Sequence, residues 1–197
     1  MTTLLFWMQI LGGLFYLLNK IFFCAKERSP NDEQARLWSI RAWMVYIAGL
    51  IPWLIILGHK DDWMIVFVEA GGLPSMLLGL ILALKHDKME KRTEVALDWF
   101  ARICAVLGIG YSVYHFGLMT NLTQWYELGG VIGFLVGTYR LAKNHLDGYV
   151  WFALMNASVG LLMYTQGYVV LGVQQLLSLI FVIDAYMVKA RKEQKTE

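Results

Sequence analysis

The chain has 197 residues, of which 58% are hydrophobic and 16% are charged, and its mean hydropathy is +0.51. This composition excludes a soluble domain of ordinary make-up, because lipid must be the main solvent for so apolar a chain. The net charge of +2 is explained by charged loops and gives no indication of a nucleic-acid partner. We therefore expect an all-α membrane protein whose main partner is the lipid bilayer.

Apolar runs separated by short charged stretches follow one another along the whole chain. Most have the length that a helix rising ~1.5 Å per residue needs to cross ~30 Å of hydrocarbon. The fifth run is shorter, and we include it because its glycines and Tyr139 extend the usable span. The sequence therefore predicts seven transmembrane helices, at 3–24, 37–57, 63–84, 96–118, 127–142, 148–165 and 168–188.

The first run lacks a basic n-region and a small-residue cleavage site, so it is expected to be a retained helix and not a signal peptide. It contains a Leu-Gly-Gly triplet that starts at Leu11, and its glycines allow close packing of helices in a membrane. The second run carries Trp43, and the third carries Glu69. A tryptophan and a carboxylate at membrane depth make both runs candidates for lining a site.

The fourth run carries Asp98 and Arg102, which are four residues apart and therefore share one face of a helix. We expect these two side chains to form a structural ion pair. The fifth run repeats the Leu-Gly-Gly triplet from Leu128, the sixth carries Trp151 and Asn156, and the seventh opens near Tyr168 and carries Gln174.

Residues of the first three runs recur in the last three, in the same order. Membrane transporters are often built from such repeats, and a single helix between the two units makes the repeat parallel. The sequence thus predicts a 3+1+3 arrangement: a first unit at 1–95, a linker helix at 96–119 and a second unit at 120–197. The matching pairs are the triplets at Leu11 and Leu128, Trp43 and Trp151, and Glu69 and Gln174.

The basic residues are distributed asymmetrically about these runs. Of the 17 Lys and Arg residues, all but Lys60 and Arg102 fall in the odd-numbered loops and the C-terminal tail. Because cytoplasmic loops carry the excess of Lys and Arg, this predicts an N-terminus outside and a C-terminus in the cytoplasm. The residues on the cytoplasmic side are Lys20, Lys26, Arg28, Arg36, Arg41, Lys85, Lys88, Lys91, Arg92, Arg140, Lys143, Lys189, Arg191, Lys192 and Lys195.

Several polar and aromatic side chains at membrane depth are candidates for binding a solute. Amides and a carboxylate that converge between two bundles could hydrogen-bond the hydroxyls of a ribose or sugar, while nearby aromatic rings stack on a planar group. The alternative is that all of them are packing or interface-anchoring residues. The candidate substrate-binding residues are Asn156, Gln174, Trp151, Tyr168, Glu69, Trp43 and Tyr164.

The stretch from Gly148 to Lys189 resembles the C-terminal repeat of PnuC-type vitamin transporters, whose members import nicotinamide riboside. The motifs that carry the resemblance are Trp151, Asn156, Gly167-Tyr168, Gln174 and the basic tail KARK. The 3+1+3 arrangement is shared in outline with SWEET sugar transporters. The resemblance implies an inner (plasma) membrane facilitator without a cofactor, a homotrimer, and a cytoplasmic kinase that traps the imported nucleoside.

The resulting prediction is a transporter that takes up a small polar vitamin precursor such as nicotinamide riboside. We expect no enzyme, because the four histidines lie on different loops or depths and form no catalytic or metal cluster. Three alternatives remain: a non-transporting membrane scaffold, a sensor of the same fold, or a sugar facilitator.

Overall fold

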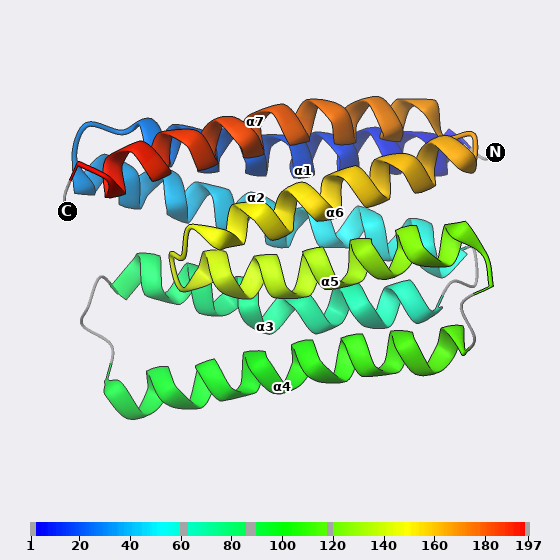
Figure 1. The fold of residues 1–197 in the computed structure, drawn as a ribbon, viewed down its shortest axis with the longest axis horizontal. Helices are drawn as coiled ribbons and strands as arrows, with labels where there is room; N and C mark the ends of the chain where they lie inside the picture. The colour runs from blue at the N-terminus through cyan, green and yellow to red at the C-terminus, as the bar shows by residue number, and fades with distance from the viewer. Residues whose placement is uncertain (1–2, 60–62, 86–89, 118–119, 196–197) are drawn as a thin grey trace.

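The structure is a computed structural model that describes residues 3–59, 63–85, 90–117 and 120–195. These residues form seven α-helices and no β-strand, close to the positions that the sequence predicts (Figure 1). The predicted Lys60 and Lys88 lie outside the described residues. The helices are α1 (Thr3–Arg28), α2 (Asp32–His59), α3 (Trp63–Lys85), α4 (Lys91–Phe116), α5 (Leu122–Ala142), α6 (Asp147–Thr165) and α7 (Val169–Glu193).

Several helices continue beyond their apolar runs into polar sequence. The N-terminal end of α5 shows how such an extension is stabilised. The Asn121 side chain accepts a hydrogen bond from the backbone N–H of Thr123, and Gln124 reaches back to the backbone N–H of Asn121. This capping box satisfies backbone donors that a helix end otherwise leaves unpaired, so the helix begins before its apolar part.

Five helices, α1 to α4 and α7, are long and apolar enough to cross a membrane, which is consistent with a multi-pass membrane protein. Among the described residues, α5 and α6 do not reach the same combination of length and hydropathy. The α6 helix has 19 residues and carries Asp147 and Asn156. One face of it is buried by α5 and α7, so it needs fewer apolar residues than a helix surrounded by lipid.

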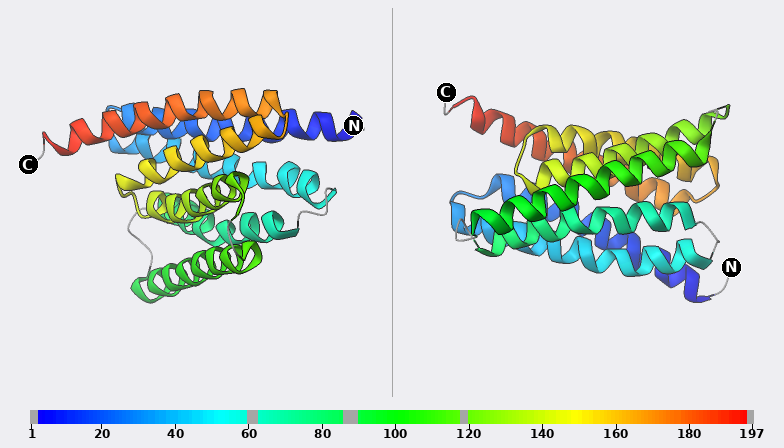
Figure 2. Two further views of the ribbon diagram at one scale, coloured as in Figure 1. Left: turned by 45° about the vertical axis from the view of Figure 1, so that its right-hand side comes forward. Right: turned by 90° about the horizontal axis from the view of Figure 1, so that it is seen from below.

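Six of the helices pack side by side in a closed ring. Going round it, α1 contacts α2, α2 contacts α3, α3 contacts α5, α5 contacts α6, α6 contacts α7, and α7 contacts α1. The α4 helix stands outside the ring and, within the part of the chain that the structure describes, packs only against α3 and α5 (Figures 1 and 2). The first helix begins, and the last helix ends, at opposite ends of the bundle (Figure 1).

A polar network fastens α4 to α5 and confirms the predicted pair of Asp98 and Arg102. Arg102 Nη2 lies 2.8 Å from Asp98 Oδ2. The Tyr139 hydroxyl donates to Asp98 Oδ1 at 2.9 Å and accepts from Arg102 Nε at 2.7 Å. Lys143 Nζ lies 2.9 Å from Glu94 and 3.5 Å from Asp98. Asp98 is therefore the acceptor that joins three donors from two helices.

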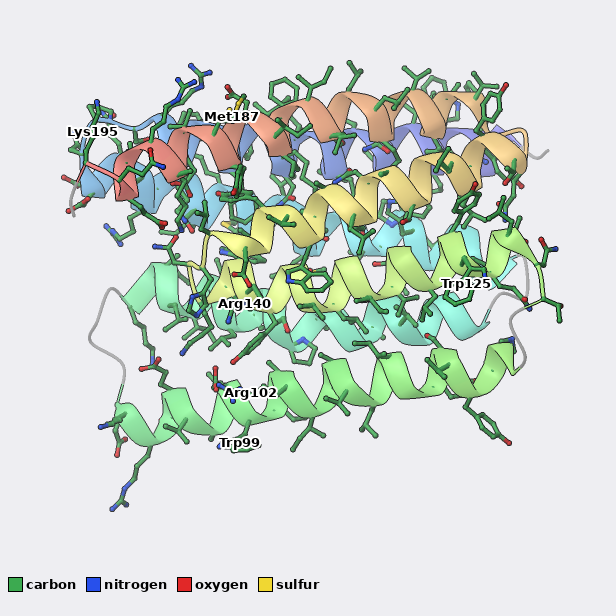
Figure 3. All side chains as sticks on the ribbon, viewed as in Figure 1. Trp99, Arg102, Trp125, Arg140, Met187 and Lys195 are labelled. Carbon is green, nitrogen blue, oxygen red and sulfur yellow. The ribbon has the colours of Figure 1, made fainter. Side chains whose placement is uncertain are left out.

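The two faces of α4 differ in character, with polar side chains of the network on one and an exposed apolar side chain on the other. Figure 3 shows Arg102 on the side of the helix that faces α5, and Trp99 on the opposite side. Trp99 is among the exposed large hydrophobic residues, as expected for a helix face in contact with lipid.

Replacing Asp98 with alanine should lower the free energy of unfolding by about 1–2 kcal/mol, because the remaining donors lose their shared acceptor in a place with little water. Removing Arg102 as well should recover only part of this loss, since Tyr139 and Lys143 still lack a partner. Thermal or denaturant unfolding of the two single variants and the double variant measures the coupling. Strictly additive losses would show that the two side chains do not interact.

Candidate functional site

A cavity lies inside the six-helix ring, in the half of the bundle where α1 begins. Every ring helix contributes to its wall, and the described lining includes no residue of α4. Most of the lining is apolar or aromatic, with a few polar side chains among it, which is the usual character of a small-molecule site. Lining residues with aromatic or polar side chains are Tyr16, Trp53, Glu69, Glu127, Phe134 and Gln175.

The polar groups of this cavity come from five different helices, with Glu127 contributed by α5. Glu69 of α3 accepts a hydrogen bond of 2.8 Å from the Tyr16 hydroxyl of α1, which fixes the orientation of the carboxylate. The indole Nε1 of Trp53 and the Oε1 of Gln175 are buried and have no hydrogen-bond partner among the described residues. Buried polar atoms are normally satisfied, so a donor and an acceptor without a partner beside a cavity suit a ligand or water.

Next to the cavity, toward the end of the bundle where α1 ends, aromatic side chains fill the interior between the six helices. The Tyr46 ring lies 6.1 Å from that of Phe134 and 6.0 Å from that of Phe152, and Phe23 lies 6.5 Å from Phe152, all edge-to-face. These pairs join α2 to α5, α2 to α6, and α1 to α6, which are not neighbours in the ring formed by the described residues. We call Phe23, Tyr46, Phe134 and Phe152 the aromatic plug.

Lys20 lies at the centre of the aromatic plug, which corrects its prediction as a cytoplasmic loop residue. Its helix α1 continues to Arg28, and the side chain is only 1% exposed. The ammonium lies 3.9 Å from the centre of the Phe152 ring and 4.5 Å from that of Tyr46. It donates one hydrogen bond of 2.8 Å, to Oδ1 of Asn19. Among the described carboxylates, none forms an ion pair with it.

At the opposite end of the bundle, polar contacts join α1 to α7. Arg28 donates from Nε and Nη2 to the two oxygens of Asp184, at 2.9 and 2.6 Å. The thiol of Cys24 donates to the same carboxylate at 2.8 Å. Lys192 reaches back to the carbonyl of Ser29 at 3.1 Å. The bidentate arginine–carboxylate pair is the geometrically most specific of these contacts.

The loop between α5 and α6 takes part in these contacts. Asn144 has a φ of 58°, a left-handed conformation that asparagine tolerates better than most residues. Its side-chain oxygen accepts hydrogen bonds from Lys26 of α1 and Lys189 of α7. Tyr149 of α6 donates to Glu27 of α1 at 2.7 Å. We call the contacts of these residues, together with Arg28–Asp184, the inner polar layer.

Of the seven candidate site residues, Glu69 lines the cavity. Asn156 is 1% exposed, donates from Nδ2 to the carbonyl of Phe152, and has an unpaired Oδ1 among the described residues. Gln174 is buried and donates to the hydroxyl of Ser178, and its neighbour Gln175 is the one that lines the cavity. The described lining of the cavity therefore combines Glu69 with Gln175, and it does not include Gln174.

The four aromatic candidates lie in different environments. Trp43 is 1% exposed and stacks on Tyr46 of the aromatic plug, below the cavity. Trp151 packs beside α5, where its backbone approaches Gly133. Tyr168 precedes α7 and packs partly buried against the core, and Tyr164 is 74% exposed. The described lining of the cavity includes none of these four.

The sequence carries signals for some residues of the cavity and the aromatic plug that the predicted site does not include. Tyr16 and Lys20 are four residues apart in an apolar run, and Phe23 and Cys24 continue the same buried face. Residues at such spacing share one side of a helix, so Lys20 could have been placed inside. Nothing in the sequence alone distinguished Tyr46 and Phe152 from other aromatic packing residues.

Comparison with protein families, with curated proteins and with solved structures gives no match for this chain. The class of protein is therefore defined by the fold and the site alone. It is a helical bundle with several membrane-length apolar helices, consistent with a multi-pass membrane protein. Its six-helix ring encloses a cavity with the two carboxylates of Glu69 and Glu127 and several aromatic side chains in the wall.

Proposed function

We propose that the protein is a membrane transporter that moves a small polar solute through its six-helix ring. The observation that carries the proposal is the asymmetry of the ring's interior. A cavity occupies one half, while the aromatic plug fills the interior beyond it and the inner polar layer joins the helices at that end. A binding site that is closed from one side of the membrane is what transport by alternating access requires.

The contacts around the ring support two three-helix units joined by α4. If α1, α2 and α3 are exchanged with α5, α6 and α7, each contact maps onto another: α1–α2 onto α5–α6, α2–α3 onto α6–α7, and α1–α7 onto α5–α3. Such pseudo-twofold exchange is expected of a parallel repeat. The proposed architecture is therefore seven transmembrane helices in a 3+1+3 arrangement.

The spacing of buried residues supports the same units and adjusts their alignment. In α1 the buried positions include Gly12, Tyr16, Lys20 and Cys24, and α5 has the same spacing at Gly130, Phe134, Thr138 and Ala142. In α2 and α6, Ala42, Trp43 and Tyr46 are matched by Gly148, Tyr149 and Phe152. This spacing pairs Trp43 with Tyr149, two residues before the Trp151 that sequence similarity indicates.

The cavity wall suggests the chemistry of the solute. Glu69 offers a negative charge, the rings of Tyr16 and Trp53 offer stacking surfaces, and Gln175 offers a free acceptor. A ring-bearing cation with hydroxyl groups matches these features, because its charge, ring and hydroxyls each have a partner. Nicotinamide riboside, which carries a pyridinium ring and a ribose, is the candidate substrate that this chemistry and the sequence resemblance share.

In the proposed orientation the cavity faces the outside and the inner polar layer faces the cytoplasm. Basic residues of that layer, such as Lys26, Arg28 and Lys189, then follow the positive-inside rule. A reporter enzyme that works only in the cytoplasm should be active when it is fused after Glu197. Activity of a periplasm-specific reporter at that position would reverse the orientation.

The transport proposal is tested by reconstituting the purified protein in liposomes and measuring uptake of labelled nicotinamide riboside. Trp53→Ala should reduce uptake, because it removes a wall of the cavity. Tyr114→Ala is the matched control, since Tyr114 lies on α4 and is 85% exposed. A ligand that raises the melting temperature without crossing the membrane would identify a sensor instead. Failure of every vitamin, nucleoside and sugar in a panel to bind or cross would overturn the proposal.

A further inference from the structure

Lys20 occupies a position that simple packing does not explain. Burying an ammonium costs free energy unless the charge is paired, and among the described residues this one has a single hydrogen bond, from Nζ to Asn19. Three ring faces lie near the ammonium, of which those of Phe152 and Tyr46 are the nearest. Ring faces attract a cation and not a neutral amine, so these contacts depend on the proton that Lys20 carries.

These contacts also join the two proposed units. Lys20 belongs to α1, whose neighbours in the ring are α2 and α7, yet its ammonium reaches the Phe152 ring of α6. Asn19, which accepts from Lys20, donates in turn to the carbonyl of Ala42 in α2 at 3.0 Å. The protonated side chain therefore holds α1, α2 and α6 together at the level where the cavity ends.

Other titratable groups surround this centre. Tyr16 on α1 and Tyr46 on α2 turn their rings toward Lys20, at 5.9 and 4.5 Å from its Nζ to the ring centres. Glu69 on α3 accepts a hydrogen bond from Tyr16, whose ring lies beside Lys20. Tyr149 on α6 is bound to Glu27 further toward the inner polar layer. Tyr16 thus links the cavity carboxylate to the site of Lys20.

We propose that Lys20 is a protonation-dependent clasp: its ammonium holds the aromatic plug closed, and release of its proton lets the two units separate on the cytoplasmic side. In this step one N–H bond of the ammonium breaks, the electron pair stays on Nζ, and the proton passes to water entering from the inner end. The proposal deepens the transport function and rests on it, because it makes solute movement proton-coupled.

The clasp itself can be tested without any substrate. Spin labels at Glu33 and His145, both exposed near the inner end of the bundle, report the distance between α2 and the start of α6. The labels are attached to cysteines introduced at these two positions, and Cys24→Ser and Cys104→Ser remove the native thiols. As the pH is raised from about 6 to about 10, where an amine loses its proton, a second population with a longer distance should grow.

Three variants in the labelled protein decide the outcome. Lys20→Met keeps most of the side-chain volume without the charge, and it should raise the ratio of open to closed molecules at about pH 6 at least about tenfold. Lys20→Arg keeps a cation that does not lose its proton, so it should stay closed at every pH. Lys91→Met, the same change at an exposed position of α4 outside the ring, should respond to pH as the unchanged protein does.

The clasp is overturned if Lys20→Arg retains the full pH response, a result that decides the matter even if Lys20→Met does not fold. It is equally overturned if Lys20→Met shows the same distances as the unchanged protein across the pH range. Uptake of nicotinamide riboside into liposomes that contain a pH-sensitive dye then separates the two proposals. If the distance depends on pH but nicotinamide riboside is not taken up, this compound is not the substrate and the clasp stands. If nicotinamide riboside is taken up without proton movement and Lys20→Met does not change the uptake, the clasp is rejected and the transport function stands.

Discussion

Gly133→Ala should destabilise the protein by at least about 2 kcal/mol, and by more than any other single methyl addition on the α5 face that meets α6. A methyl group at Gly133 would lie 2.6 Å from the backbone nitrogen of Met155 and 2.6 Å from the carbonyl oxygen of Trp151. Backbone atoms of a helix cannot rotate away as a side chain can. The α5 and α6 helices would have to move apart, which would open gaps along their whole contact.

Gly110→Ala provides the matched control for this substitution. Gly110 also lies within a helix, α4, but nothing lies within 4 Å of the position that a methyl group would take. Alanine favours the helix by up to about 1 kcal/mol over glycine, so this variant should be unchanged or slightly more stable. Unfolding in detergent by heat or denaturant measures both variants. Equal stabilities for the two would mean that α5 and α6 are not as close as the structure has them.

The helices could be predicted from the sequence because their signal is local. Runs of apolar residues of membrane length mark α1 to α4 and α7, and the charged stretches between them mark the loops. The pairing of Asp98 with Arg102 was predictable for the same reason, since residues four apart on one helix must face the same way. The ends of helices were less predictable, because Asn121 and similar capping residues extend a helix beyond its apolar part.

The site was harder to predict because it depends on helix rotation and on contacts between distant segments. One residue along a helix turns the side chain by ~100°, and this is the difference between Gln174, which binds Ser178, and Gln175, which lines the cavity. The sequence predicts Lys20 in a loop because a lysine in an apolar protein is most often at a membrane surface. Its buried position inside the bundle depends on the aromatic rings of α2 and α6, which are distant in the sequence.

Glu69 is the one predicted site residue whose role in binding has a charge-specific signature. Glu69→Gln keeps the shape of the side chain and an oxygen that can accept from the Tyr16 hydroxyl, but removes the negative charge. If a pyridinium ring binds beside it, the affinity for nicotinamide riboside should fall about ten- to a hundredfold, as expected for losing a counter-charge in a site with little water. Binding of uncharged nicotinamide should change less than about threefold by the same reasoning, because no charge is paired.

Thermal shift or calorimetry with both ligands measures this difference directly. Glu94→Gln is the control, because Glu94 binds Lys143 outside the ring and the change should leave both affinities unaltered. An equal loss for the charged and the uncharged ligand would mean that Glu69 acts by holding Tyr16 in place, and not by pairing with the solute. No loss for either would remove Glu69 from the site. A selective loss for the cation would make Glu69 the counter-charge of the bound solute, with Tyr16 holding the carboxylate in place between the solute and the aromatic plug.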